Sequence, residues 1–145
     1  MAPYSIVTYE MATRYLDWLR QAERDLEQAE DSRKAGRHEW ACFASHQTAE
    51  MAISALHDYF GQQSWGHTLV RLLHDLPGDI QVPDILLDKA LVLDTYYIPT
   101  RYPDAHPEGA PFERYGALQS GEAVQYAREV IQFVRDALAQ RKDRP

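Results

Sequence analysis

The segment from His38 to Phe60 constrains the fold of this chain more than any other, because it is long, nearly uncharged and rich in small residues. Its only acids are Glu39, Glu50 and Asp58. The small residues are Ala41, Ala44, Ser45, Ala49, Ala52 and Ala55. Small side chains allow neighbouring helices to approach closely on more than one side. We therefore expect this segment to be the central helix of a bundle, ended by Gly61.

The flanking segments also place apolar residues at helical intervals of three and four. This spacing predicts a first helix over Met11–Lys34, closed by Gly36 in the left-handed conformation. A short helix is expected over His67–Leu76. A fourth helix is expected to have Pro83 in its first turn and to carry apolar residues as far as Tyr97.

Between Pro99 and Gln119 four prolines and two glycines interrupt the helical pattern, which predicts a long irregular loop. Ser120 is then expected to cap a last helix, and the tail from Gln140 to Pro145 to be frayed. The alternating pattern of a β-strand is absent from the sequence. The predicted fold is all-α, an antiparallel up-and-down bundle of four long helices plus one short helix. We expect a single domain over residues 1–145, with its core at about residues 10–140.

The charge and cysteine content limit the possible functions. A net charge of −7 argues against a broad phosphate-binding surface, so any nucleic-acid site must be local. The single Cys42 excludes an internal disulfide and a cysteine zinc cluster, which favours a reducing cytoplasm. No stretch approaches the roughly 18 apolar residues of a membrane span, and the amino terminus lacks a secretion-signal pattern. Glycine-rich phosphate loops and metal-ligand motifs are also absent, so we predict neither a cofactor nor a metal.

Arg101 and His106 are the candidate catalytic residues, because both lie in the irregular loop, where side chains can converge on a ligand. A guanidinium binds phosphate and an imidazole moves protons near neutral pH, so the pair could cleave RNA without a metal. The structural alternative is that Arg101 pairs with an acid such as Asp94 or Asp104 and holds the loop in place. When Arg101 and His106 are considered alone, we favour this structural alternative over RNA cleavage.

His46 and Glu50 share one face of the central helix, an arrangement that could bind a ligand or contribute to a metal site. Two ligands are too few for a metal, so we favour hydrogen-bonded structural groups. His67, directly before an apolar helix, is interpreted as a local cap or hydrogen-bonding residue. The aromatic residues around the loop suit either base stacking or anchoring, and we favour anchoring. They are Tyr96, Tyr97, Tyr102, Phe112 and Tyr115.

Three segments taken together resemble the HEPN family, the higher eukaryotes and prokaryotes nucleotide-binding domain. They are Phe43–Glu50 (FASHQTAE), His67 at the start of a leucine-rich helix, and Thr100–Asp104 (TRYPD). The similarity covers roughly Tyr15 to Leu138. The resemblance implies a five-helix bundle that is usually a homodimer and is often encoded beside a minimal nucleotidyltransferase. In catalytic members an Arg is followed four to six residues later by His, a spacing that Arg101 and His106 match.

Three functional hypotheses follow. The first is a cytoplasmic dimer that works with a nucleotidyltransferase partner and binds a nucleotide or RNA phosphate, with Arg101, Tyr97, Tyr102, His46 and Glu50 as ligand-binding residues. The second is a metal-independent endoribonuclease toxin of a toxin–antitoxin pair, which uses Arg101 and His106 across the dimer. The third is a non-catalytic structural interaction module.

Overall fold

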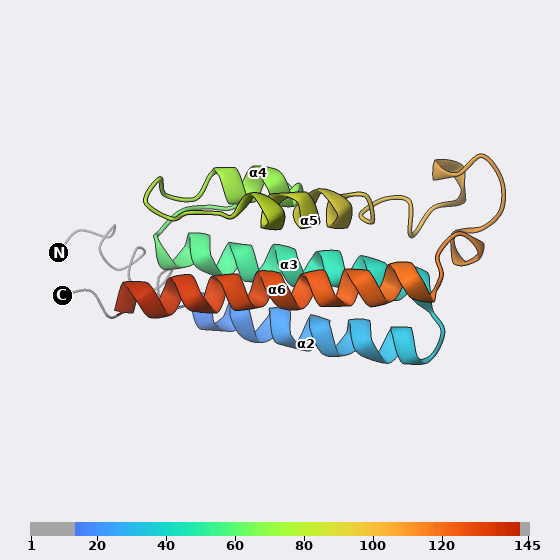
Figure 1. The fold of residues 1–145 in the computed structure, drawn as a ribbon, viewed down its shortest axis with the longest axis horizontal. Helices are drawn as coiled ribbons and strands as arrows, with labels where there is room; N and C mark the ends of the chain where they lie inside the picture. The colour runs from blue at the N-terminus through green and yellow to red at the C-terminus, as the bar shows by residue number, and fades with distance from the viewer. Residues whose placement is uncertain (1–13, 143–145) are drawn as a thin grey trace.

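The computed structural model describes residues 14–142, and every regular element within them is helical (Figure 1). The long helices are α2 (Tyr15–Lys34), α3 (His38–Tyr59), α5 (Asp84–Asp94) and α6 (Ala117–Lys142), and α4 (Leu69–His74) is short. The predicted helical bundle of four long helices and one short helix is confirmed. Figure 1 shows α4 and α5 along one side of the α3–α6 pair and α2 along the other side.

Helix α3 is central, as its composition predicts, because it contacts α2, α4, α5 and α6. A first buried set of residues along it repeats at intervals of three and four, and we call it the small-residue stripe. Its members are Ala41, Ala44, Thr48, Ala52 and Ala55. A second buried set, the polar stripe, consists of His46, Glu50 and His57. Because the two sets differ in angular position around the helix axis, α3 has one buried face of small side chains and another of polar ones.

Small residues also line the other helices of the core. Ala22 and Ala29 of α2 and Ala123 and Ala127 of α6 are all fully buried. Where small side chains meet, helix backbones can approach closely and exclude water from a large apolar area. This packing fixes α2, α3 and α6 as a scaffold for the shorter helices.

Several predicted helix ends are confirmed and others shift. Gly36 has φ +78° and closes α2 as predicted, and Gly61, at φ +70°, follows α3. The predicted start at Met11 lies outside the described residues. Helix α4 begins at Leu69 rather than at His67, and α5 begins at Asp84 with the extended Pro83 just before it.

The predictions for the last helix were wrong at both ends. Ser120 does not cap α6 but lies inside it, fully buried, because the helix begins at Ala117. Its hydroxyl donates to the Ala117 carbonyl, at 3.3 Å, and accepts a hydrogen bond from His38 Nδ1, at 2.7 Å. In the tail expected to be frayed, Gln140 to Pro145, residues 140–142 are helical, and the rest of this prediction lies outside the described residues. Among the described residues, no helix is long and apolar enough to cross a membrane.

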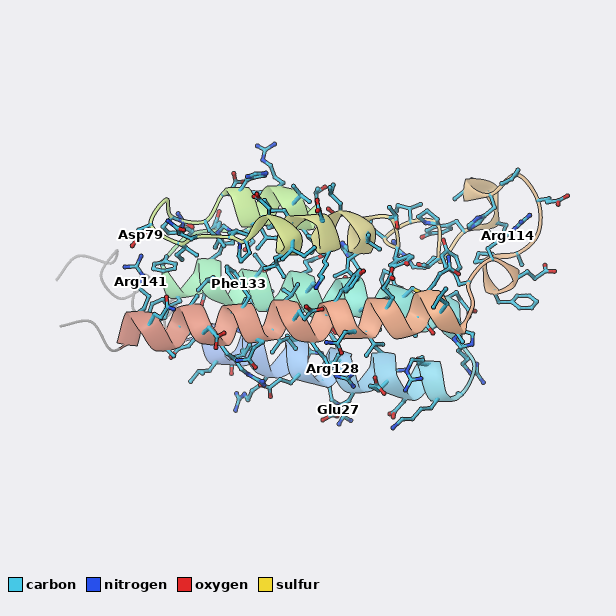
Figure 2. The ribbon with its side chains drawn as sticks, viewed as in Figure 1. Glu27, Asp79, Arg114, Arg128, Phe133 and Arg141 are labelled. Atoms are coloured by element: carbon cyan, nitrogen blue, oxygen red, sulfur yellow. The ribbon has the colours of Figure 1, made fainter. Side chains whose placement is uncertain are left out.

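The segment between α5 and α6 is irregular as predicted, apart from two single 3-10 turns (Figure 1). They are Pro103–Ala105 and Pro111–Glu113, and each begins at a proline, whose fixed φ suits the first position of a helical turn. Arg114 ties this segment together by donating from both Nε, at 2.8 Å, and Nη2 to the Glu108 carbonyl (Figure 2).

Candidate functional site

The backbone of the segment after α5 folds back on itself and fixes Arg101. The Thr100 hydroxyl donates to the Tyr96 carbonyl at 2.6 Å, and Arg101 Nε donates to the Tyr97 carbonyl at 2.9 Å. Thr100 is buried and Arg101 is half-buried. The stem of Arg101 is therefore anchored, and its guanidinium points in a direction set by the turn.

Aromatic rings surround the Arg101 guanidinium. Its Cζ atom lies 4.4 Å from the ring centroid of Phe43, 4.8 Å from that of Tyr97 and 5.3 Å from that of Tyr102. A guanidinium over aromatic faces is stabilised by cation–π attraction, which does not consume its N–H groups. We call Phe43, Tyr97, Arg101 and Tyr102 the Arg101 cluster.

The predicted structural partner of Arg101 is missing. No carboxylate in residues 14–142 lies within 4.0 Å of its guanidinium, so the expected pairing with Asp94 or Asp104 is wrong. Asp94 is instead hydrogen-bonded to the start of α4: its carboxylate accepts from the Leu69 N–H at 2.7 Å and the Val70 N–H at 3.3 Å. Within the described chain, both terminal nitrogens of Arg101 are therefore left for another acceptor.

His46 is fully buried beside this cluster. Its Nε2 lies 2.9 Å from the His67 carbonyl oxygen and 3.3 Å from Asp94 Oδ1. Both neighbours are acceptors, so Nε2 carries the proton. Its Nδ1 has no hydrogen-bond partner among the described residues and lies 4.0 Å from Glu50 Oε1. His46 and Glu50 therefore take part in one polar network, although His46 is fully buried and one of its ring nitrogens is unpartnered among the described residues.

His67 connects this network to the Arg101 cluster. Its Nδ1 donates to Glu50 Oε1 at 3.0 Å, and its ring stacks on Tyr97 with the centroids 4.7 Å apart and the planes at 18°. The Glu50 side chain is 11% exposed, whereas the His67 side chain is 54% exposed. We call His46, Glu50, His67 and Asp94 the histidine network, which joins buried groups to an exposed imidazole.

Two hollows border the Arg101 cluster. One, of about 330 Å³, is lined by His46, His67, Thr68, Asp94, Thr95, Tyr97, Ile98 and Pro99. The other, of about 550 Å³, is lined by Asp25, Gln28, Ser32, Arg37, Trp40, Phe43, Ala44 and Gln47. Arg101 contacts Tyr97 in the first lining and Phe43 in the second. In the second hollow, burial raises the pKa of Asp25, opposed by a hydrogen bond from Gln21.

His106 makes contacts different from those of Arg101. Its Nε2 donates to the Pro99 carbonyl at 2.6 Å, and its ring meets that of Tyr115 edge-on, with centroids 5.8 Å apart. No hydrogen bond joins the side chains of Arg101 and His106 among residues 14–142. No three His, Cys, Asp or Glu side chains among residues 14–142 are arranged to hold a metal ion.

Two members of the histidine network were missed as site residues by sequence reasoning. His67 was interpreted as a cap or a hydrogen-bonding residue, and its hydrogen bond to Glu50 agrees with the second alternative. Asp94 was considered only as a partner of Arg101. Asp94 carried a usable signal, because an acid as the last residue of a helix opposes the helix dipole and needs a compensating partner. For His67 the position before an apolar helix gave no such signal.

The sequence and the fold agree with one family. The model of the HEPN domain family matches residues 15–137, and the chain belongs to the HEPN family. No curated protein matches the chain.

Solved structures of similar proteins support this assignment. The chain is 48% identical to TT1696 from Thermus thermophilus, with a TM-score of 0.84 over 85% of this chain and 97% of that one. It is 38% identical to ST0689, an archaeal HEPN homologue, with a TM-score of 0.74 over 86% and 97% of the two chains. It is 35% identical to the HEPN domain protein tm0613 from Thermotoga maritima, with a TM-score of 0.69 over 85% of this chain and 98% of that one.

Proposed function

We propose that this HEPN-domain protein binds a phosphate group of a nucleotide or RNA at Arg101. The observation that carries the proposal is that the guanidinium is held by three aromatic rings, with no carboxylate within reach in the described chain. Planar guanidinium groups bind phosphate oxygens through paired N–H donors, and the adjacent rings offer stacking surfaces for a base. Tyr102, which is exposed, is the proposed stacking residue. Tyr97 takes part in ligand binding by holding Arg101 and His67, and His46 and Glu50 support the site through the histidine network.

The proposal includes the setting that membership of the HEPN family suggests. We expect a cytoplasmic homodimer that works with a minimal nucleotidyltransferase partner. Light scattering after gel filtration tests the dimer, and co-purification with the product of a neighbouring nucleotidyltransferase gene tests the partner. A monomer that captures no such enzyme would contradict this part of the proposal without affecting the phosphate site.

Ligand binding is tested by fluorescence anisotropy with a labelled oligoribonucleotide and by calorimetry with the four ribonucleoside triphosphates. Arg101→Ala is expected to weaken binding at least tenfold, because a charge-assisted contact of about 1.5–3 kcal/mol is lost. Arg101→Lys keeps the charge but loses the planar pair of donors, so it should restore only part of the affinity.

The control is Arg24→Ala. Arg24 pairs with Glu27 on the exposed surface of α2, so its removal should leave binding unchanged. If Arg101→Ala lowers the melting temperature while the native protein shows no response to any phosphate ligand, the chain is a structural interaction module.

One observation favours a second candidate function, a metal-independent endoribonuclease. His106 Nε2 donates to the Pro99 carbonyl, so in a neutral imidazole Nδ1 is left as a proton acceptor. Nδ1 would take the proton of a ribose 2′-hydroxyl, whose oxygen attacks the phosphorus as the P–O5′ bond breaks, and the proton then returns to O5′. Arg101 would stabilise the phosphorane. As the resemblance to catalytic HEPN members implies a composite site shared by two protomers, His106 would act from the partner protomer.

This candidate requires RNA cleavage in EDTA that both Arg101→Ala and His106→Ala abolish. Intact RNA, or cleavage indifferent to both substitutions, would exclude it. The matched control is His74→Ala, because His74 is an exposed histidine on α4.

A further inference from the structure

His67 is fixed at three points although more than half of its side chain is exposed. His46 Nε2 donates to its backbone carbonyl at 2.9 Å, Glu50 Oε1 accepts from its Nδ1 at 3.0 Å, and its ring stacks on Tyr97. Burying His46 and Glu50 costs free energy, whereas an imidazole on the surface adds little to the core. The arrangement therefore orients the exposed imidazole more than it stabilises the bundle.

The contact with Glu50 also defines which nitrogen of His67 is available. An ionised carboxylate only accepts hydrogen bonds, so Nδ1 carries the proton. In the neutral imidazole Nε2 then has a free lone pair. That lone pair accepts a hydrogen bond from a hydroxyl or an N–H group and repels a phosphate oxygen. His67 is thus suited to a different part of the ligand than Arg101.

His67 and Arg101 both pack against the ring of Tyr97. The His67 centroid is 4.7 Å from the Tyr97 centroid, and Arg101 Cζ is 4.8 Å from it. The two groups are therefore separated by no more than the sum of these distances. His67 and Tyr97 also line the hollow of about 330 Å³. The phosphate and the sugar of a single nucleotide can bridge groups at such a separation.

The geometry points to His67 as the residue that selects ribose over 2′-deoxyribose: its Nε2 accepts a hydrogen bond from the 2′-hydroxyl of the nucleotide whose phosphate lies at Arg101. The inference rests on the proposed function, since it requires a phosphate at Arg101. It adds a specificity determinant on a residue outside the Arg101–His106 pair. The 2′-hydroxyl is the group by which proteins distinguish RNA from DNA.

The test compares labelled oligonucleotides of the same sequence, one ribo and one deoxyribo, composed of A, C and G only so that they differ in the 2′-hydroxyl alone. Anisotropy is measured at about pH 8, above the usual titration range of an imidazole. The native protein should bind the ribo strand about tenfold more tightly, the equivalent of one hydrogen bond of roughly 1.4 kcal/mol. Adenosine monophosphate and its 2′-deoxy form, used as competitors, show whether the free nucleotide has the same preference.

His67→Ala and His67→Phe should both bring the affinity ratio close to one. The phenylalanine retains a ring to stack on Tyr97, so it separates loss of the acceptor from loss of stacking. His74→Ala should keep the native ratio, because His74 is exposed and lies on the next helix. Thermal melting confirms that each variant is folded.

The outcomes are distinguishable. A ribo preference that survives in both His67 variants would overturn the inference. So would equal binding of the two strands by the native protein, although binding lost in Arg101→Ala would then still support the proposed function. Failure of the native protein to bind either strand or either monophosphate would overturn both.

Discussion

The small-residue stripe and the polar stripe are two buried faces of α3, and they depend on their surroundings in different ways. In the small-residue stripe the one polar group, the Thr48 hydroxyl, donates to the Ala44 carbonyl at 2.9 Å, within the same helix. In the polar stripe His46, Glu50 and His57 depend on groups from other segments. The packing of the first face thus depends on the volume of its side chains, whereas that of the second depends on hydrogen-bond partners in other segments.

The difference shows where this fold carries sites for chemistry. On the face of small side chains the one hydroxyl is bonded within the helix, so no polar group is directed to a ligand, and the face tolerates little added volume. A buried polar face has to be hydrogen-bonded, and each partner brings a loop into a fixed position. His46 and Glu50 position His67 in this way, and His57 binds the Leu72 carbonyl at 2.8 Å. The candidate site therefore lies on the polar side of α3.

Ala52→Leu should produce the largest effect. Ala52 is fully buried, so added methylenes force neighbouring helices apart, and we expect a loss of up to about 3 kcal/mol in the free energy of unfolding. Urea denaturation measures it. Met51→Leu, one residue away on a half-buried position, conserves volume and should cost less than about 1.5 kcal/mol. If the two variants are equally stable, the small-residue stripe is not tightly packed.

His46→Phe tests the polar stripe and should cost about 2 kcal/mol, because the Asp94 carboxylate and the His67 carbonyl lose a buried donor. Ligand affinity should also fall as His67 loses its backbone anchor. His74→Phe on the surface is the control and should change the free energy of unfolding by less than about 0.5 kcal/mol. A His46→Phe protein as stable as the native one would show that the polar stripe does not require its partners.

Glu30→Gln tests the ion pair between Glu30 of α2 and Arg128 of α6 and should have the smallest effect. Burial alone would raise the pKa of Glu30, but hydrogen bonds and charges from Arg33 and Arg128 lower it below its ordinary 4.5. Figure 2 shows Arg128 on α6 close to α2, where it donates to Glu30 Oε1 at 2.7 Å. A lowered folded-state pKa gives stability that is present above pH 4.5 and is lost as the pH falls through the folded-state pKa.

The measurement for Glu30 is the free energy of unfolding across this acidic range. The native protein should lose about 0.5 kcal/mol more than Glu30→Gln as the pH falls. Arg24→Ala, which leaves the Glu30 contacts intact, should follow the native curve. Parallel curves for the native protein and Glu30→Gln would show that the pair between α2 and α6 contributes nothing to stability.

The helices could be predicted from the sequence because their signals are local. Apolar spacing located each long helix, and the small residues of His38–Phe60 identified the central one. Gly36 worked as an end signal because its left-handed conformation depends only on its own backbone. The fold class therefore follows from short-range patterns.

The candidate site could be predicted only in part, because its contacts join distant segments. His67 and Glu50 are 17 residues apart, and Leu69 and Asp94 are 25 apart. Ser120 was predicted to be a cap, and nothing local in the sequence indicated its contact with His38, which is 82 residues away. Arg101 was predicted to be a phosphate ligand from its chemistry, but its aromatic surroundings include Phe43, which only the folded chain brings near.

The Asp94 carboxylate, which accepts from the Leu69 and Val70 amides, has a consequence for the motions of the protein. The six-residue α4 is too short to be stable alone, and its first amide groups are bonded to the last residue of α5. Local unfolding of either α4 or α5 therefore breaks these hydrogen bonds and exposes the other helix to solvent. In deuterium exchange the amides of Leu69 and Val70 should become labelled at the same rate as those of α5, as one cooperative unit that opens apart from the α2–α3–α6 scaffold.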